Sequence, residues 1–203
     1  MAKIHPQTSV KGSDHSTSER ETFTIWMKSL VFHGNGCTVF NSKGEVVFRV
    51  DNYQTRHSSE VFLMDFNGEV LFSMKRKNQR LRIFESWESY KWIDSKLNKE
   101  ISWFQVRSNC SIFRRHKHKT CHVSLGCDKT TRRSSYQITE LEGKSTFKII
   151  DNAGHLVAQV IKKQSLSGVP LGDDVLTLVL EPQMDYSLVM ALVTVDGLIN
   201  QKL

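Results

Sequence analysis

The segment from Cys110 to Cys127 contains the densest group of residues in this chain that could bind a metal ion. Three cysteines and three histidines occur there: Cys110, His116, His118, Cys121, His122 and Cys127. Structural zinc sites usually draw on closely paired ligands, such as C-x2-C with a second pair at a suitable distance. No such pairing is present, and the three cysteines stand among apolar strand residues, where cysteine is commonly buried. We therefore predict no metal site and no cofactor.

Two clusters of cations could bind a phosphate-rich partner. The first basic cluster, between two expected strands, consists of Arg114, Arg115, Lys117 and Lys119, with His116 and His118 among them. The second basic cluster spans an expected strand, turn and strand and consists of Lys75, Arg76, Lys77, Arg80 and Arg82. Several cations on one exposed segment can match the phosphates of an anionic surface. The alternative interpretation is solvated surface that keeps a sheet edge soluble.

The overall charge of the chain favours an anionic partner for these two clusters. The net charge is +7 at neutral pH and the isoelectric point is near 9.3. Such a balance fits an anionic lipid headgroup, a nucleic acid or an acidic partner. The aromatic residues on which single-stranded nucleic acids stack are not interleaved with either cluster. Nucleic acid is therefore the less favoured partner.

The common sequence signatures of enzymes are missing from this chain. It has no Walker A loop, no G-x-S-x-G elbow, no H-E-x-x-H motif and no complete G-x-G-x-x-G. Catalytic groups can still converge from distant strands, so the absence of a motif lowers the expectation of catalysis without excluding it. We expect a non-enzymatic protein with no catalytic residues.

A recurring hairpin pattern defines the elements that must position the basic clusters. Three segments share an apolar run, then Asn or Asp, two further residues, Gly, and an alternating apolar run: 38–50, 61–74 and 146–160. Asn or Asp opening a type I turn, with Gly in the left-handed conformation three positions later, is typical of a hairpin with a Gly bulge. Further strand patterns lie at Leu81–Ser86, Ile101–Val106, Cys121–Leu125, Ser135–Leu141 and Val175–Leu180. About twelve short strands at this spacing predict a closed antiparallel β-barrel or a sandwich.

The segment Met184–Val195 (MDYSLVMALVTV) decides between these two folds. It is apolar nearly all round, so a helix formed by it must be enclosed. Its length of roughly 18 Å falls well short of the roughly 30 Å hydrocarbon core of a bilayer. Pro182 separates it from the last expected strand. We therefore predict a mainly β protein in which a closed antiparallel β-barrel surrounds a central C-terminal α-helix.

Composition along the chain predicts one domain after a short tail. Residues 1–22 contain almost nothing apolar, so we expect a disordered N-terminal tail, followed by a single domain over residues 23–203. No leader-like segment and no apolar run of about 20 residues is present. We therefore expect a soluble intracellular monomer, in the cytoplasm or nucleus or peripherally at a membrane, with its cysteines reduced.

The order of several segments resembles the plant LURP-one-related (LOR) proteins. These segments are GNGCTVFNSKGEVVFRVDNY, VFLMDFNGEVLF with the later LRIF, HLVAQVIKK, and LEPQMDYSLVMALVTVDGLIN. The resemblance extends from Phe23 to Asn200. Its most specific part is the C-terminal block, in which a strand, a proline, an Asp-Tyr pair and an apolar helix follow one another.

This resemblance implies a tubby C-terminal-like fold, a β-barrel of about twelve strands around its C-terminal helix. The superfamily includes phospholipid scramblases and the tubby proteins, which are regarded as membrane-tethered transcription regulators that bind phosphoinositides. Plant relatives are associated with defence against pathogens. No catalytic residue is established for the family, so none is carried over, and the basic clusters are assigned from charge alone. The alternatives are a nucleic-acid-binding transcription regulator, a lipid transporter or scramblase, and a scaffold for a protein partner.

Overall fold

The computed structural model describes most of the chain between Ser18 and Asn200. The described ranges are 18–28, 35–55, 58–77, 85–93, 96–97, 102–108, 120–126, 133–141 and 146–200. The expected tail, residues 1–22, lies largely outside them. The first strand begins at Glu21, where the sequence predicted order from Phe23.

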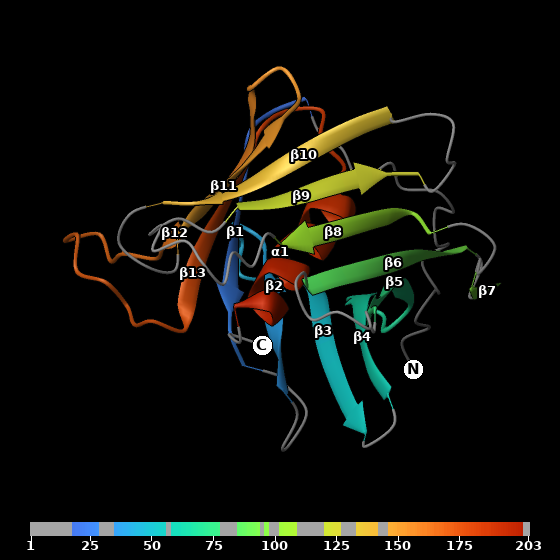
Figure 1. The fold of residues 1–203 in the computed structure, drawn as a ribbon. Helices are drawn as coiled ribbons and strands as arrows, with labels where there is room; N and C mark the ends of the chain where they lie inside the picture. The colour runs from blue at the N-terminus through green and yellow to red at the C-terminus, as the bar shows by residue number, and fades with distance from the viewer. Residues whose placement is uncertain are drawn as a thin grey trace, which may run out of the picture.

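Twelve of the described strands form one closed antiparallel ring (Figure 1). The strands are β1 (Glu21–Trp26), β2 (Asn35–Phe40), β3 (Val46–Thr55), β4 (Ser58–Asp65), β5 (Val70–Arg76), β6 (Glu85–Ile93), β7 (Lys96–Leu97), β8 (Phe104–Ser108), β9 (Thr120–Leu125), β10 (Arg133–Glu140), β11 (Phe147–Asp151), β12 (Leu156–Lys162) and β13 (Val175–Leu180). The short β7 pairs only with β6. The other strands pair with their neighbours in sequence, β6 pairs with β8, and β13 pairs with β1. The prediction of a barrel of about twelve strands is confirmed.

Helix α1 (Tyr186–Ile199) runs through the centre of this ring (Figure 1). Every residue from Ser187 to Ile199 is buried, as the apolar sequence predicted. The helix begins after Asp185, which caps it. The backbone N–H groups of Ser187 and Leu188 have no partner within the first helical turn, and they donate to the Asp185 carboxylate instead.

The helix extends beyond the apolar segment, through Asp196 to Ile199. Asp196 is buried near this end and is stabilised locally. Its carboxylate accepts a hydrogen bond of 3.0 Å from the Asn200 side chain, and its backbone carbonyl accepts the Asn200 N–H. A buried carboxyl group that has a hydrogen-bond partner does not have to terminate a helix.

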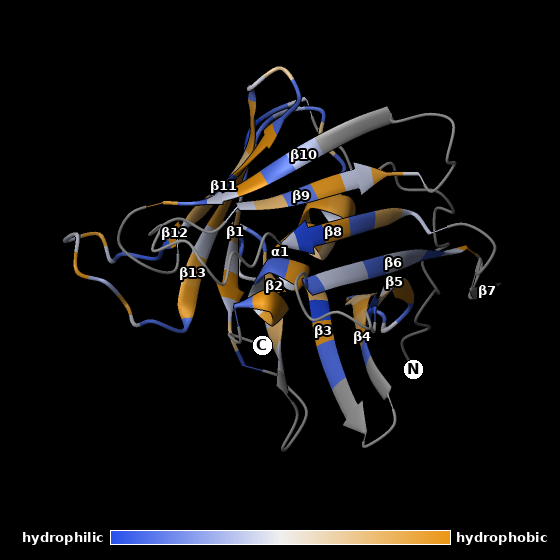
Figure 2. Cartoon of the chain, viewed as in Figure 1, coloured by the Kyte–Doolittle hydropathy of each residue, from blue (hydrophilic) through white to orange (hydrophobic). Residues whose placement is uncertain are grey.

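One continuous apolar core joins the helix to the inner face of the barrel (Figure 2). The strands place apolar residues inward; in β8, for example, Phe104 and Val106 point inward and the polar Gln105 and Arg107 point outward. Met190 and Leu192 of α1 are among the largest fully buried side chains. The helix side chains therefore fill the centre of the barrel.

The predicted Gly-bulge hairpins form at all three positions. In each turn the glycine N–H donates to the carbonyl of the opening Asn41, Asp65 or Asp151, at 3.0 to 3.1 Å, and the strand register shifts beside the turn. Gly154 has φ = +87°, a conformation that a side chain makes unfavourable. The backbone N–H of His155, followed by the His155 side chain and the N–H of Ala153, holds the pKa of Asp151 below its usual value.

Antiparallel pairing of sequential strands places the connections alternately at two ends of the barrel. We call them rim A and rim B. Rim A carries the connections that follow β1, β3, β5, β8, β10 and β12. Rim B carries those that follow β2, β4, β6, β9, β11 and β13, including the three Gly-bulge turns.

Candidate functional site on one rim of the barrel

Three of the nine predicted site residues lie within the described parts of the chain. Lys75 and Arg76 end β5, and Lys77 follows it, so all three lie at rim A with exposed side chains. The remaining residues are outside the described ranges: Arg80, Arg82, Arg114, Arg115, Lys117 and Lys119. The expected strand over Leu81–Ser86 overlaps the described chain only at Glu85 and Ser86, which begin β6.

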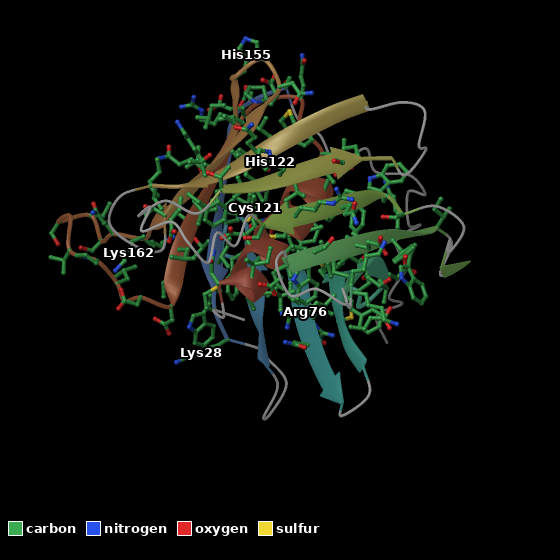
Figure 3. The ribbon with its side chains drawn as sticks, viewed as in Figure 1. Lys28, Arg76, Cys121, His122, His155 and Lys162 are labelled. Carbon is green, nitrogen blue, oxygen red and sulfur yellow. The ribbon has the colours of Figure 1, made fainter. Side chains whose placement is uncertain are left out.

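The neighbouring strand β6 supplies carboxylates to the second basic cluster. The Arg76 guanidinium lies 3.4 Å from a carboxylate oxygen of Glu85 (Figure 3 labels Arg76), and the Lys77 ammonium lies 2.6 Å from one of Glu88. Lys75 lies opposite Glu60 and Glu88 in the strand register. Exposed ion pairs contribute only about 0–1 kcal/mol, so these cations can exchange their partners for a ligand. The local positive charge is nevertheless smaller than the sequence cluster suggested.

The strands that border the first basic cluster reach the same rim. Ser108 ends β8 and Thr120 begins β9, and Ser108 pairs with both Glu85 and Cys121. The strand ends that flank the sequence Arg114–Lys119 are therefore separated from the second basic cluster only by β6 and β8. The fold brings the borders of two basic segments, distant in sequence, to one arc of rim A.

Sequence reasoning missed a further feature of rim A, an apolar finger between β12 and β13. The finger consists of Gln164–Leu171 and extends away from the barrel at the left of Figure 1. Three of its side chains are strongly exposed: Leu166 (111%), Val169 (59%) and Leu171 (53%). The signal was present in the sequence, since Ser165-Leu166-Ser167-Gly168 has the same spacing as the Gly-bulge turns, with leucine where polar residues are usual.

Two ion pairs and two hydrogen bonds fix the base of the finger. Lys162 pairs with Asp173, and the Lys28 ammonium lies 3.5 Å from a carboxylate oxygen of Asp174 (Figure 3 labels both lysines). The backbone N–H of Met27 donates to the Asp174 carbonyl at 2.8 Å. Lys163 donates to the hydroxyl of Thr24 on β1. The base is therefore tied to the end of β1 and carries three lysines.

A shallow groove of about 450 Å³ runs along the outer face of β1 and β2, from Lys163 near the finger's base to the Gly-bulge turn at Asn41–Gly44 on rim B. It is lined by Thr22, Thr24, Phe40, Asn41, Ser42, Gly44 and Lys163. These residues offer one ammonium, several hydroxyls and an aromatic ring. Such a set can hold an anion. Because the lining contains no carboxylate, histidine or cysteine, the groove offers no acid–base pair.

The described part of the Cys110–Cys127 segment does not form a metal site. Cys121 is buried and its neighbour His122 is exposed, because successive residues of β9 point to opposite faces of the sheet. Across the described ranges, no three residues of the His, Cys, Asp and Glu types are arranged to hold a metal ion. Cys110, His116, His118 and Cys127 lie outside these ranges.

Cys37, buried on the inner face of β2, is expected to be chemically inert in the folded protein. Burial raises the pKa of its thiol to about 12, and the Asp51 carboxylate adds to the shift. Because the thiolate is the reactive form, iodoacetamide at pH 8 should leave Cys37 unmodified in the native protein and modify it in denaturant. Peptide mass spectrometry measures both states. Rapid modification of the native protein would contradict the buried position.

The comparisons with known proteins agree with this architecture. Residues 21–195 match the sequence profile described as LURP-one-related. The chain belongs to the LURP-one-related family. It is 40% identical to LURP-one-related 11 of Arabidopsis thaliana over 98% of this chain and 89% of that protein. It is 43% identical to LURP-one-related 3 of the same plant, over 100% of this chain and 94% of that protein. The predicted family membership is confirmed.

A solved structure supports the fold. The X-ray structure of an Arabidopsis thaliana protein matches with a TM-score of 0.60, covering 92% of this chain and 94% of that chain. Because the two sequences are only 15% identical, this likeness concerns the fold alone. Within the described residues of this LURP-one-related chain, α1 is too short to cross a bilayer, and no other helix is present that could.

Proposed function

We propose that this protein is a non-catalytic binding module that docks reversibly on anionic phospholipid through rim A of its barrel. The observation that supports this most is the arrangement of rim A. Lys75, Arg76 and Lys77 lie there, and the strands that border the sequence Arg114–Lys119 end there too. One flat anionic surface can therefore face Lys75–Lys77 together with the strand ends that border the sequence Arg114–Lys119.

The filled interior favours binding at the surface over chemistry in a pocket. In an eight-stranded or larger barrel, a ligand site usually lies inside the ring or at its mouth. Here the side chains of α1, such as Met190 and Leu192, occupy the inside. The groove beside β1 offers one lysine and hydroxyl groups, which suit an anion and provide no catalytic pair.

The expected attachment is weak and sensitive to salt. A Lys or Arg near an anionic leaflet contributes about 1 kcal/mol, and this attraction decays within a Debye length of about 8 Å at physiological ionic strength. The ion pairs of Arg76 and Lys77 with Glu85 and Glu88 reduce the contribution of the second basic cluster. A multiply charged headgroup such as a phosphoinositide offsets this better than a singly charged lipid.

The wider role that we propose follows the resemblance of the chain to the tubby and scramblase group. A relation to membrane-tethered regulators fits a module that binds lipid without inserting a helix, since α1 is buried from Ser187 to Ile199. The same burial argues against scramblase activity by insertion of this helix. A role in plant defence, with a regulatory protein as second partner, completes this proposal.

Vesicle co-sedimentation tests the proposal. The full-length protein is mixed with vesicles of phosphatidylcholine alone, or with added phosphatidylserine or phosphatidylinositol 4,5-bisphosphate, over a series of salt concentrations. We expect binding only to the anionic vesicles, strongest with the phosphoinositide and decreasing with salt. Failure to bind any anionic vesicle at low salt would refute the proposal, as would equal binding to phosphatidylcholine. Tighter binding to duplex DNA in a parallel assay would favour the nucleic-acid alternative.

A further inference from the structure

We propose that the apolar finger, Gln164–Leu171, inserts into the interfacial region of an anionic bilayer, with Leu166, Val169 and Leu171 reaching the acyl chains. This inference rests on the proposed function and deepens it. The basic residues would bring rim A to the membrane, whereas the finger would supply the apolar contact that holds it there.

The finger is a hydrogen-bonded turn. The Ser165 N–H donates to the Val169 carbonyl at 2.8 Å, and the Gly168 N–H donates to the Ser165 carbonyl at 2.9 Å. Gln164 and Pro170 form an antiparallel bridge, and the Leu171 N–H donates to the Lys163 carbonyl. Because these bonds satisfy the backbone within the turn, the tip can enter a less polar layer without leaving those polar groups unpaired.

The exposed side chains of the finger have no covering partner within the described residues. Leu166 is fully exposed, and more than half of the accessible surface of Val169 and Leu171 remains. Exposed apolar residues are common singly, but three within six positions at the tip of a projecting turn are not. Figure 2 shows hydrophobic colour on the outer part of this loop and hydrophilic colour toward the barrel.

The order of side chains from tip to base matches the layers of an anionic leaflet. The finger itself contains no charged residue. Lys162, Lys163 and Lys28 lie at its base, where they would be level with the phosphates when the tip is inserted. The carboxylates at this level, Asp173 and Asp174, are each paired with a lysine, so neither faces the lipid as an uncompensated charge.

A bilayer suits this shape better than a protein groove. The finger is a convex projection with Lys162, Lys163 and Lys28 at its base, so a broad anionic plane can contact the tip and these cations together. A groove in a protein partner would enclose the finger alone. Vesicles made of lipid alone distinguish the two alternatives, because they contain no partner protein that could bind the finger.

The chain offers a matched internal control at the opposite rim. Phe66 occupies the same position in the turn Asp65–Gly68 as Leu166 does in the turn Ser165–Gly168, and it is 69% exposed. The two turns share their hydrogen bonding, but Phe66 lies at rim B. If exposed apolar residues bound vesicles non-specifically, substitution at either tip would weaken vesicle binding equally. If the protein docks through rim A, only substitution of Leu166 weakens it.

The test compares three full-length proteins on the phosphatidylinositol 4,5-bisphosphate vesicles: wild type, the triple variant Leu166→Ser, Val169→Ser, Leu171→Ser, and the control Phe66→Ser. We expect the triple variant to bind at least roughly tenfold more weakly and the control to bind like wild type. Thermal unfolding verifies that all three are folded. A fourth protein, the triple variant Leu166→Ile, Val169→Ile, Leu171→Ile, keeps apolar side chains in the finger and should bind vesicles like wild type.

Insertion itself is measured with a tryptophan at each tip. Leu166→Trp is expected to gain quenching by brominated lipid above the wild-type background, and Phe66→Trp is not. If wild type binds anionic vesicles but the serine variant binds equally well and Leu166→Trp is not quenched, the finger inference is overturned and the proposed function stands. If wild type binds no anionic vesicle, the proposed function fails and the inference fails with it.

Discussion

Replacing Leu192 by alanine is expected to lower the free energy of unfolding by about 2–5 kcal/mol. Leu192 lies at the centre of α1 with 1% of its surface exposed, inside the ring of strands. Truncation removes the transfer free energy of three carbons and leaves a cavity that a closed barrel cannot easily collapse. Urea denaturation followed by circular dichroism measures the change.

The matched control for this substitution is Leu166→Ala in the finger. The chemical change is the same, but Leu166 is fully exposed, so we expect stability to change by no more than about 0.5 kcal/mol. Similar effects of the two substitutions would contradict the enclosure of the helix. The comparison isolates burial, since residue type and the number of deleted atoms are identical.

Replacing Arg114, Arg115, Lys117 and Lys119 together by glutamate is expected to abolish binding to anionic vesicles. Loss of four attractions of about 1 kcal/mol each already weakens binding by roughly a thousandfold, and the new carboxylates add repulsion. Co-sedimentation with phosphatidylinositol 4,5-bisphosphate vesicles at low salt measures the loss. Unchanged binding would remove the first basic cluster from the proposed site.

A pair of single variants distinguishes the effect of where a charge lies on the protein from the effect of total charge on vesicle binding. Lys117→Glu changes the first basic cluster, whereas Lys43→Glu changes an exposed lysine in the turn between β2 and β3 at rim B. Both variants alter the net charge equally. We expect Lys117→Glu to weaken vesicle binding several-fold more than Lys43→Glu. Equal losses would show that the vesicle responds to overall charge and that rim A has no special role.

The architecture was largely predictable because its signals are local. Asn41, Asp65 and Asp151 open turns whose glycines need positive φ, and each turn forms as the spacing predicts. The apolar segment from Leu188 to Val195 required enclosure, and the barrel provides it. The helix boundary was less predictable. Asp196 interrupts the apolar run, but its bonds with Asn200 keep it within the helix.

The candidate site was less predictable because it depends on partners from other strands. The pairing of Arg76 with Glu85 and of Lys77 with Glu88 follows from the register between β5 and β6, which composition does not reveal. The described part of the second basic cluster and the strand ends that border the first are far apart in sequence, so their position on the same rim could not be predicted. It becomes evident only when the strands are arranged in alternating directions around a ring. The exposure of Leu166 was missed because leucine by itself predicts burial, although its place in a segment with the Gly-bulge spacing indicated a surface turn.

Amide hydrogen exchange, with and without phosphatidylinositol 4,5-bisphosphate vesicles, tests the central claim most directly. That claim is a barrel filled by α1 that docks from outside, through rim A. We expect the amides from Val189 to Ile199 to exchange only through global unfolding in both conditions. Vesicles should slow exchange in the finger and leave the turn at Asp65–Gly68 unchanged. Fast exchange of the helix amides, free or on vesicles, would show that the helix leaves the barrel and would contradict the account.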